Sequence, residues 1–532
     1  MKKIIKITQI FILCLMASAC DDTVDIIPTA PNSENYFTSE EEYEKALIGV
    51  YDMLQTTLYN VMVAHTASDD IIAGGDPNTF DQPTLQAIDK MKHGPDNNDQ
   101  IQLIWQLMYA GINRANYVLE FKDKTEFEGK DDLIAQVYFL RAHFAFELTK
   151  FFGDVPLPTE KRDGVDRIQD TRILFGDQYT MTRVGSKEAI YALIEEDLKE
   201  AIPNLPTTRN KSEVYKITKG AAEALLGKAY LYHKKYEEAA ISLNNVIDSE
   251  AGYELLEGSA YEKLFTRTGE NSKESVFEVQ YTGVVGNNWD CLHCNAGNYM
   301  PQSNGPRAMK DKSLGAYKYG WGINIISKYL YAAYENNDKR RNVTIYEPTK
   351  GKYTESRENS GYYNKKYLVT KSEPTVSTDP VSYQNNYRVI RYADVLLMAA
   401  EAEAQSIGAN AINHLNKVRA RAFGDNTHNY PYAGENDLLE AIYKERRLEL
   451  AGEGHRFFDL VRTGKAKAAF DAYNASIDAE PIDDEESEED RINRLNDRKI
   501  NYTLGKNEIF PIPTVELNLA NAIDTWGQNP NY

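Results

Sequence analysis

The chain of 532 residues has few cysteines, few tryptophans and a deficit of positive charge. It carries 60 Lys and Arg against 80 Asp and Glu, a formal net charge of −20. Because nucleic-acid-binding proteins neutralise phosphates with clustered Lys and Arg, this balance argues against DNA or RNA as a partner. Hydrophobic residues nevertheless make up 42% of the chain, which predicts a large folded body rather than a disordered one.

The sequence also lacks the short motifs of common enzyme classes. It contains neither H-E-x-x-H nor G-x-S-x-G, and its 8 His are scattered without metal-ligand spacing. Gly220 and Gly227 resemble a phosphate-binding loop only in part, because six residues separate them and Ala229 replaces Ser or Thr. We therefore expect a protein that is not an enzyme and needs no metal or cofactor, although paired carboxylates for glycoside hydrolysis stay open in so acidic a chain.

Long apolar runs are absent apart from the N-terminal segment. Residues 1–19 have a basic start, a short apolar stretch and small residues at the end, which is the pattern of a signal peptide. Cys20 follows directly, as in the lipobox of bacterial lipoproteins, in which this cysteine is diacylated. Ala17 stands where Leu is usual in that motif, and ordinary secretion is the alternative. We expect lipidation at Cys20 and a tether over residues 20–35.

Helical periodicity dominates the rest of the chain. Residues 224–247 carry L-G-x2-Y, then Ala nine residues later and large apolar residues after it, as in a tetratricopeptide repeat. A weaker copy follows from Ala399, with Leu415 and Val418 at matching spacings. Because single repeats cannot bury their faces alone, we expect a mainly α fold. Its dispersed helix pairs form one tetratricopeptide-like scaffold with long irregular insertions and few short strands.

The composition changes between the two copies. Residues 281–367 hold 12 of the 36 Tyr and 2 of the 4 Trp, and 13 Lys and Arg against 7 Asp and Glu. Long irregular segments in compact proteins are usually functional or disordered, and the aromatic content argues against disorder. We therefore predict a loop-rich ligand face over 276–384, flanked by helical scaffold over 36–275 and 385–532.

Five motifs occur in a fixed order along the chain: IWQLMYAGINRANYVL (104–119), FLRAHFAFELTKFFGDVPL (139–157), RYADVLLMAAEAEA (391–404), ERRLELAGEGHRFFDLVRTGK (445–465) and FPIPTVELNLANAIDTWGQNPNY (510–532). Together they resemble the SusD/RagB family of surface nutrient-binding lipoproteins, which implies a single SusD-like domain over 36–532. Arginines among apolar residues usually form bidentate pairs that hold helices together, and we expect this of Arg114, Arg141, Arg447, Arg456 and Arg462.

The resemblance also implies a function. Family members capture nutrients, mostly glycans, for an outer-membrane transporter. We therefore expect non-catalytic binding of an oligosaccharide or polysaccharide and its delivery to a SusC-like TonB-dependent transporter. Asp21 and Asp22 after Cys20 resemble the surface-export signal of Bacteroidota lipoproteins, so we expect a lipid-anchored protein exposed on the outer membrane. The alternatives are a surface glycan-degrading enzyme, a protein-binding repeat scaffold, and a peptide as ligand.

Sugar sites combine exposed aromatic faces with polar side chains on loops. Three clusters fit this description: Asn288, Trp289, Asp290 and Tyr299; Tyr317, Tyr319 and Trp321; and the loop 68–83 with Asp69, Asp76 and Phe80. The alternative is that the rings pack the loops onto the helical core and that the loop 68–83 is merely solvated. The positive charge of 281–367 would suit an anionic glycan, and scattered, solvated Lys residues are the alternative.

Cys291 and Cys294 are the remaining cysteines. The haem pattern fails because Asn295 stands where His is needed, zinc would need two more ligands, and no thioredoxin-like context is present. Outside the cytoplasm a disulfide is the default, and it would stiffen the loop that carries Trp289. The acidic run 478–490 lacks the spacing and Gly of an EF-hand, which favours a solvated loop over a Ca²⁺ site.

Overall fold

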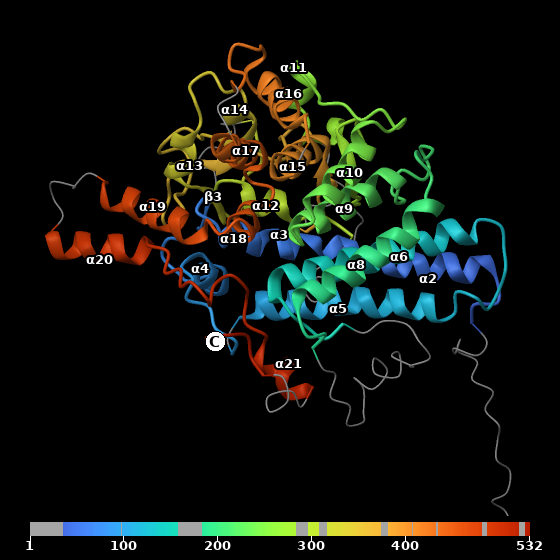
Figure 1. The fold of residues 1–532 in the computed structure, drawn as a ribbon. Coiled ribbons are helices and arrows are strands. Elements are labelled where there is room, and N and C mark those ends of the chain that lie inside the picture. Colours follow the sequence, from blue (N-terminus) through green and yellow to red (C-terminus); the bar gives the residue numbers. More distant parts are fainter. Residues whose placement is uncertain are drawn as a thin grey trace, which may run out of the picture.

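The computed structural model describes residues 36–96, 98–157, 183–283, 296–307, 316–373, 381–406, 408–431, 435–480, 487–520 and 527–532. The signal peptide, the tether and residues 481–486 of the acidic run lie outside these ranges, and what is predicted for them stays a prediction. The same holds for Cys20, Asp21, Asp22, Asn288, Trp289, Asp290, Cys291 and Cys294. Within the described ranges helices dominate and strands are few and short, which confirms the expected mainly α fold (Figure 1). No helix of this part is both long and apolar enough to cross a bilayer.

The helices of the scaffold are amphipathic or wholly buried, and shorter helices decorate the loop-rich part. In chain order they are α2 (Glu40–Asp52), α3 (Thr57–Thr66), α4 (Pro83–Asp89), α5 (Asp99–Glu120), α6 (Lys130–Phe152), α8 (Lys187–Ala201), α9 (Lys219–Tyr232), α10 (Tyr236–Ile247), α11 (Gly258–Glu262), α12 (Met300–Asn304), α13 (Lys328–Ala333), α14 (Arg340–Thr344), α15 (Tyr392–Gln405), α16 (Ala411–Phe423), α17 (Glu435–Leu450), α18 (Arg456–Arg462), α19 (Ala466–Asp478), α20 (Glu488–Arg498) and α21 (Thr514–Leu519).

Six short strands form two small sheets in the described residues. They are β1 (Ile71–Ala73), β2 (Ser275–Val279), β3 (Asn324–Ile326), β4 (Ile345–Tyr346), β5 (Tyr363–Asn364) and β6 (Tyr387–Arg391). The larger sheet has the order β1-β3-β5-β4, and the smaller one pairs β2 with β6, antiparallel. The first sheet therefore joins an early loop to the loop-rich segment, which decides where the functional site forms.

Several scaffold helices begin and end at residues suited to those places. The side chains of Asn98, Ser186 and Thr218 accept hydrogen bonds from backbone N–H groups in the first turns of α5, α8 and α9. Helix α6 ends at Gly153, whose φ of 74° suits a residue without a side chain. Because these signals are local, the sequence alone can predict where such helices begin and end.

The two dispersed repeats stack in space. The first copy forms α9 and α10 and the second forms α15 and α16, and α10 packs directly against α15 (Figure 1). Gly227 permits the close approach within the first pair, because a Cβ there would collide with the side chain of Leu243. The layer continues through α8 and α6 to α5, so helix pairs far apart in the sequence share one scaffold.

Buried ion pairs hold these helices together, as expected for the arginines of the five motifs. Arg141 on α6 donates two hydrogen bonds to Asp197 on α8, at 2.8 and 2.6 Å, with both side chains buried. Arg462 pairs with Glu401, which links α18 to α15. The pair of Arg114 with Asp52 is expected to stabilise the fold less than the others. Both side chains are roughly half exposed, and exposed ion pairs contribute little to stability.

Candidate functional site

The pairing of β1 with β3 brings the loop 68–83 against the loop-rich segment. Ile71 pairs with Ile326 and Ala73 with Asn324 in antiparallel register. The ladder continues beyond the strands, because the N–H groups of Gly74 and Gly75 donate to the carbonyls of Ile323 and Gly322 at 2.8 and 2.9 Å. The sequence clusters around Phe80 and around Trp321, separate in the chain, therefore meet at one surface.

The base of the loop 68–83 is held by two arginines of the late family motif. Arg456 binds Asp69 with two hydrogen bonds of 2.8 Å, and Arg447 binds Asp70 at 2.6 Å. Burial opposes the ionisation of Asp69, but the guanidinium groups of Arg456 and Arg447 outweigh it and lower its pKa to about 2. Asp69 is 1% exposed, so it anchors the loop and does not face a ligand, contrary to the interpretation of this residue above.

Above this anchor, Arg307 ties the two clusters together. Its guanidinium binds Asp76 at 2.7 Å and Asp81 at 3.2 Å, and also donates to the carbonyl of Trp321 at 3.4 Å. The side chains of Asp76 and Asp81 are 24% and 31% exposed, so they form an accessible acidic rim. The site therefore offers a held cation and two carboxylates at the same edge.

Phe80 lies on the outside of this edge and is 67% exposed. The guanidinium of Arg357 stacks over its ring at 4.2 Å from the centroid, and the backbone N–H of Arg357 donates to the carbonyl of Gly75 at 3.1 Å. A cation over an aromatic face is attracted by the ring quadrupole, which holds both groups in place. We call the whole group the Phe80 surface: Asp76, Phe80, Asp81, Arg307, Trp321 and Arg357.

Close backbone contact allows three loops to meet here. Gly322 has a φ of +61°, and a Cβ at this position would collide with Oγ of Ser356, one residue before Arg357. Gly74 is equally tight, because its Cβ would collide with the carbonyl of Gly322. The absence of side chains at these two positions therefore positions the stacked pair of Arg357 and Phe80.

Replacing Gly322 by Ala is expected to displace Ser356 and Arg357 and to weaken ligand binding. A left-handed backbone costs an L-residue about 1–2 kcal/mol by itself, so a control with the same strain is needed. Gly351 has a φ of +77° with no atom near its Cβ position. Gly351→Ala should lower the free energy of unfolding without changing affinity, and equal affinity losses in both variants would contradict the expectation.

The remaining predicted aromatics divide between surface and core. Tyr319 is 48% exposed, and Trp321 is partly buried against the main core. Tyr317 is half-buried and contacts the ring of Tyr346 edge-on at 4.9 Å. Tyr299 contacts Tyr59 at 5.5 Å, and burial raises its pKa well above the usual range. Tyr299 thus lies among core rings, whereas Asp76, Phe80 and the backbone of Trp321 come together, and Tyr319 stays exposed two residues before Trp321.

Three residues of the Phe80 surface were not singled out from the sequence. Arg307 and Arg357 belong to the positively charged stretch, where they look like any other scattered cations. Asp81 lies in the loop 68–83 but has no distinguishing pattern. The positive net charge of residues 281–367 was the only sequence feature that pointed to these arginines. It does not predict which of the positive side chains pair with which carboxylates.

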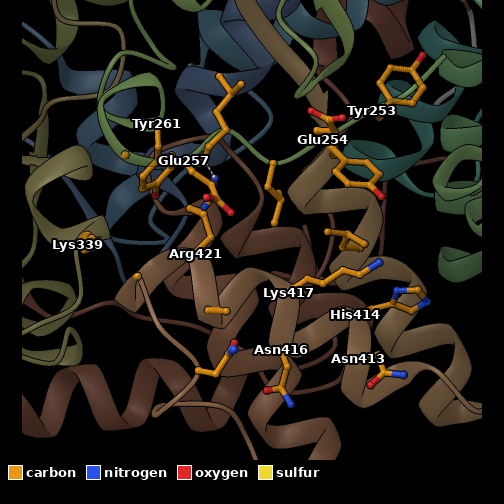
Figure 2. A pocket seen from close by; sticks show the side chains of 18 of the residues that line it. Tyr253, Glu254, Glu257, Tyr261, Lys339, Asn413, His414, Asn416, Lys417 and Arg421 are labelled. Atoms are coloured by element: carbon orange, nitrogen blue, oxygen red, sulfur yellow. Dashed lines mark hydrogen bonds between the residues drawn. The ribbon is translucent and has the colours of Figure 1, made fainter.

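A larger hollow, of about 1940 Å³, lies elsewhere, between α10, α16 and residues 253–262 (Figure 2). Its α16 wall presents Asn413, Asn416 and Lys417, but none of the described residues predicted for the site lines it. Two of its rings, Tyr261 and Tyr392, are only 3% and 7% exposed. A third ring, Tyr253, is half-buried, and the other lining side chains are mainly polar, so the described lining of the hollow lacks a ring as exposed as Phe80. Within the described residues, no group of three His, Cys, Asp or Glu side chains is arranged to hold a metal ion.

Two family models match this chain, one in each half. The model of the SusD family matches residues 273–532, and a model described as "Starch-binding associating with outer membrane" matches residues 28–231. A SusD-like protein of Formosa agariphila is 24% identical over 501 residues, which cover 86% of this chain and 90% of the relative.

Solved structures agree over nearly the whole chain. A laminarin-binding SusD-like protein is 31% identical, with a TM-score of 0.77, and the match covers 93% of this chain and 100% of that one. Surface glycan-binding protein A from Bacteroides thetaiotaomicron, in complex with laminarihexaose, is 25% identical with a TM-score of 0.75 and the same coverage.

Proposed function

This chain belongs to the SusD family, and we propose that it binds an oligosaccharide or polysaccharide at the cell surface without catalysing a reaction on it. The observation that carries the proposal is the Phe80 surface, where an exposed ring stacked with Arg357 lies beside Arg307 and its two carboxylates. Aromatic faces suit the apolar faces of sugar rings, and charged side chains at the rim suit their hydroxyl groups.

A β-glucan such as laminarin is the ligand class that we propose first. The support is the 31% identical relative that is named for laminarin binding, together with a relative solved with laminarihexaose. The Phe80 surface is compatible with an uncharged chain, because Arg307 is already matched by Asp76 and Asp81. The hydroxyl groups of a neutral sugar can accept from Arg357 and donate to the remaining lone pairs of the two carboxylates, whose oxygens each accept one bond within the protein.

We also propose that the protein acts at the outer membrane with a partner. Lipid on Cys20 would hold it there, and residues 20–35 would serve as a tether. A tethered binder remains at high effective concentration near a transporter, which favours handover of a captured glycan to a SusC-like TonB-dependent protein. The description of the family model that matches residues 28–231 supports the outer-membrane location.

A glycan panel tests this function with the purified protein. Laminarin, starch, xylan and pectin are titrated calorimetrically, and the solutions are then analysed for released oligosaccharides. Binding of laminarin without any product is expected. Release of products would support the alternative of a surface enzyme. Unchanged affinity in both Trp289→Ala and Trp321→Ala would move the site or favour a protein-binding scaffold.

Replacing Phe80 by Ala is expected to weaken glycan binding by roughly tenfold, about 1.4 kcal/mol, because the stacking face is removed. The matched control is Leu504→Ala, since Leu504 is a similarly exposed apolar residue at 72% but lies in the C-terminal part of the chain. Both variants should unfold at the wild-type temperature. A tenfold loss in the control, or none in Phe80→Ala, would count against the Phe80 surface as the site.

A further inference from the structure

Arg357 lies at the boundary between the Phe80 surface and a neighbouring pocket. It also lines a pocket of about 440 Å³ whose other walls include Lys328 and Tyr329 of α13, Asn359, Ser476 of α19 and Arg494 of α20. Ile72 of β1 and Ser327 next to β3 also line this pocket. The pocket therefore begins where the Phe80 surface ends, and the β1–β3 ladder supports both.

Within the described part of the chain, the guanidinium of Arg357 has no acidic partner, and it lies between the Phe80 surface and the pocket. It forms no ion pair with any of the described residues, and it stacks on the ring of Phe80. Arg498, which lines the same pocket, differs because Glu480 holds it with bonds of 2.6 and 2.7 Å. The N–H groups of Arg357 are thus available to a ligand that passes from one side to the other.

The pocket has the chemistry of a sugar site. Tyr329 contributes a partly exposed ring that is held in place, because Arg447 stacks over it at 4.7 Å and Tyr473 contacts it edge-on at 6.0 Å. Ser476 and Asn359 add hydroxyl and amide groups along the wall. A volume of 440 Å³ falls in the range of small-molecule pockets, which is enough for about one or two sugar rings.

We propose that this pocket is a further sugar subsite, which takes the units that follow the one stacked on Phe80. A glycan chain would run across Phe80, past the N–H groups of Arg357 and into the pocket beside Tyr329. The inference rests on the proposed function and sharpens its ligand class to chains long enough to reach both places. Affinity should therefore rise with chain length until the pocket is filled.

The test is a titration with β-1,3-gluco-oligosaccharides, from the disaccharide to the heptasaccharide. In the wild type, affinity is expected to rise about tenfold once the chain extends beyond the Phe80 surface, which is about 1.4 kcal/mol. Ser476→Trp places an indole in the pocket and should abolish that rise, while the affinity for the shortest oligosaccharide that binds stays within about twofold. Lys328→Ala, at an exposed position of the same pocket, should reduce the rise without risk to folding.

A matched control introduces the same side chain into the larger hollow. Asn413→Trp, at an exposed position on α16 (Figure 2), should leave the whole length series unchanged. If affinity still rises with chain length in Ser476→Trp and Lys328→Ala, the subsite is overturned and the proposed function stands. The same holds if these variants lose affinity equally for every oligosaccharide length. Absence of binding to every oligosaccharide by the wild type overturns the proposed β-glucan ligand and the subsite together.

Discussion

Arg456→Ala is expected to lower the free energy of unfolding by about 3–5 kcal/mol, because it leaves a buried carboxylate without its partner. The side chain of Asp69 is fully buried, and Arg456 binds both of its oxygens. Arg447 also reaches Asp69, at 3.3 Å, but its shorter bonds go to Asp70, so it can replace Arg456 only in part. The same substitution should weaken glycan binding, because Asp69 precedes β1 and the loop that carries Phe80.

Urea denaturation at neutral pH measures the first effect, with Arg114→Ala as control. The pair of Arg114 with Asp52 is 42% and 45% exposed, so its loss should cost no more than about 1 kcal/mol. Asp69→Asn in the Arg456→Ala background should recover part of the lost stability, because it removes the stranded charge. Similar costs for Arg456→Ala and Arg114→Ala would show that the buried pair is not what holds the loop.

Stability is expected to fall steeply as the pH is lowered from 6.5 toward 4. Burial lowers the pKa of His65, His93 and His143 to about 4, from a usual value of 6.5. Between these values the unfolded chain binds protons that the folded protein excludes, so unfolding is favoured as the pH falls. Asp89 acts in the opposite direction, because burial raises its pKa to about 6, and burial also raises the pKa of Asp70, Glu270 and Glu516. Burial lowers the pKa of His414 and His455 as well, so five histidines oppose these four carboxyl groups.

The pH range of this loss of stability distinguishes the histidines from the carboxylates that cause ordinary acid denaturation. Carboxylates with a lowered pKa, such as Glu147 at about 2, lose their contribution only below their usual value of 4.5. Each pKa unit corresponds to about 1.4 kcal/mol per group, so the five histidines together should dominate between pH 6.5 and 4.5. His143→Phe, among the rings of Phe144 and Phe277, should flatten the curve of unfolding free energy against pH. A flat wild-type curve would contradict the prediction.

Much of the scaffold was predictable because its signals are local. The L-G-x2-Y pattern around Gly227 identifies a helix pair from residues within one repeat, and the structure shows α9 and α10 there. The motif arginines were also predictable as residues that pair with carboxylates, because a buried Arg requires such a partner whatever the topology. The partner itself was not, since Asp197 and Asp69 are ordinary residues until the helices are packed. Arg141 and Arg462 join helices as expected, whereas Arg447 and Arg456 hold a loop.

The candidate site was predictable only in outline. A Gly- and Tyr-rich stretch of opposite charge indicated the region, and Phe80 was singled out as one aromatic on a loop. Local composition could not separate Tyr299, which turns inward against Tyr59, from Tyr319, which stays exposed. Burial depends on which element covers a ring, and that element can come from anywhere in the chain.

The sequence by itself determined the helical class, the family motifs and the segment in which we propose a binding surface, because periodicity, caps and composition act over a few neighbouring residues. Only the tertiary structure decided the surface itself. Arg307 reaches Asp81 and Asp76 across 226 and 231 residues of chain. Those contacts exist because β1 pairs with β3 and Gly322 lets the loops approach. Backbone hydrogen bonds between distant strands carry no signature in either strand alone. The few aromatic and positive residues that form the surface could therefore be told from the rest only after the fold had brought them together.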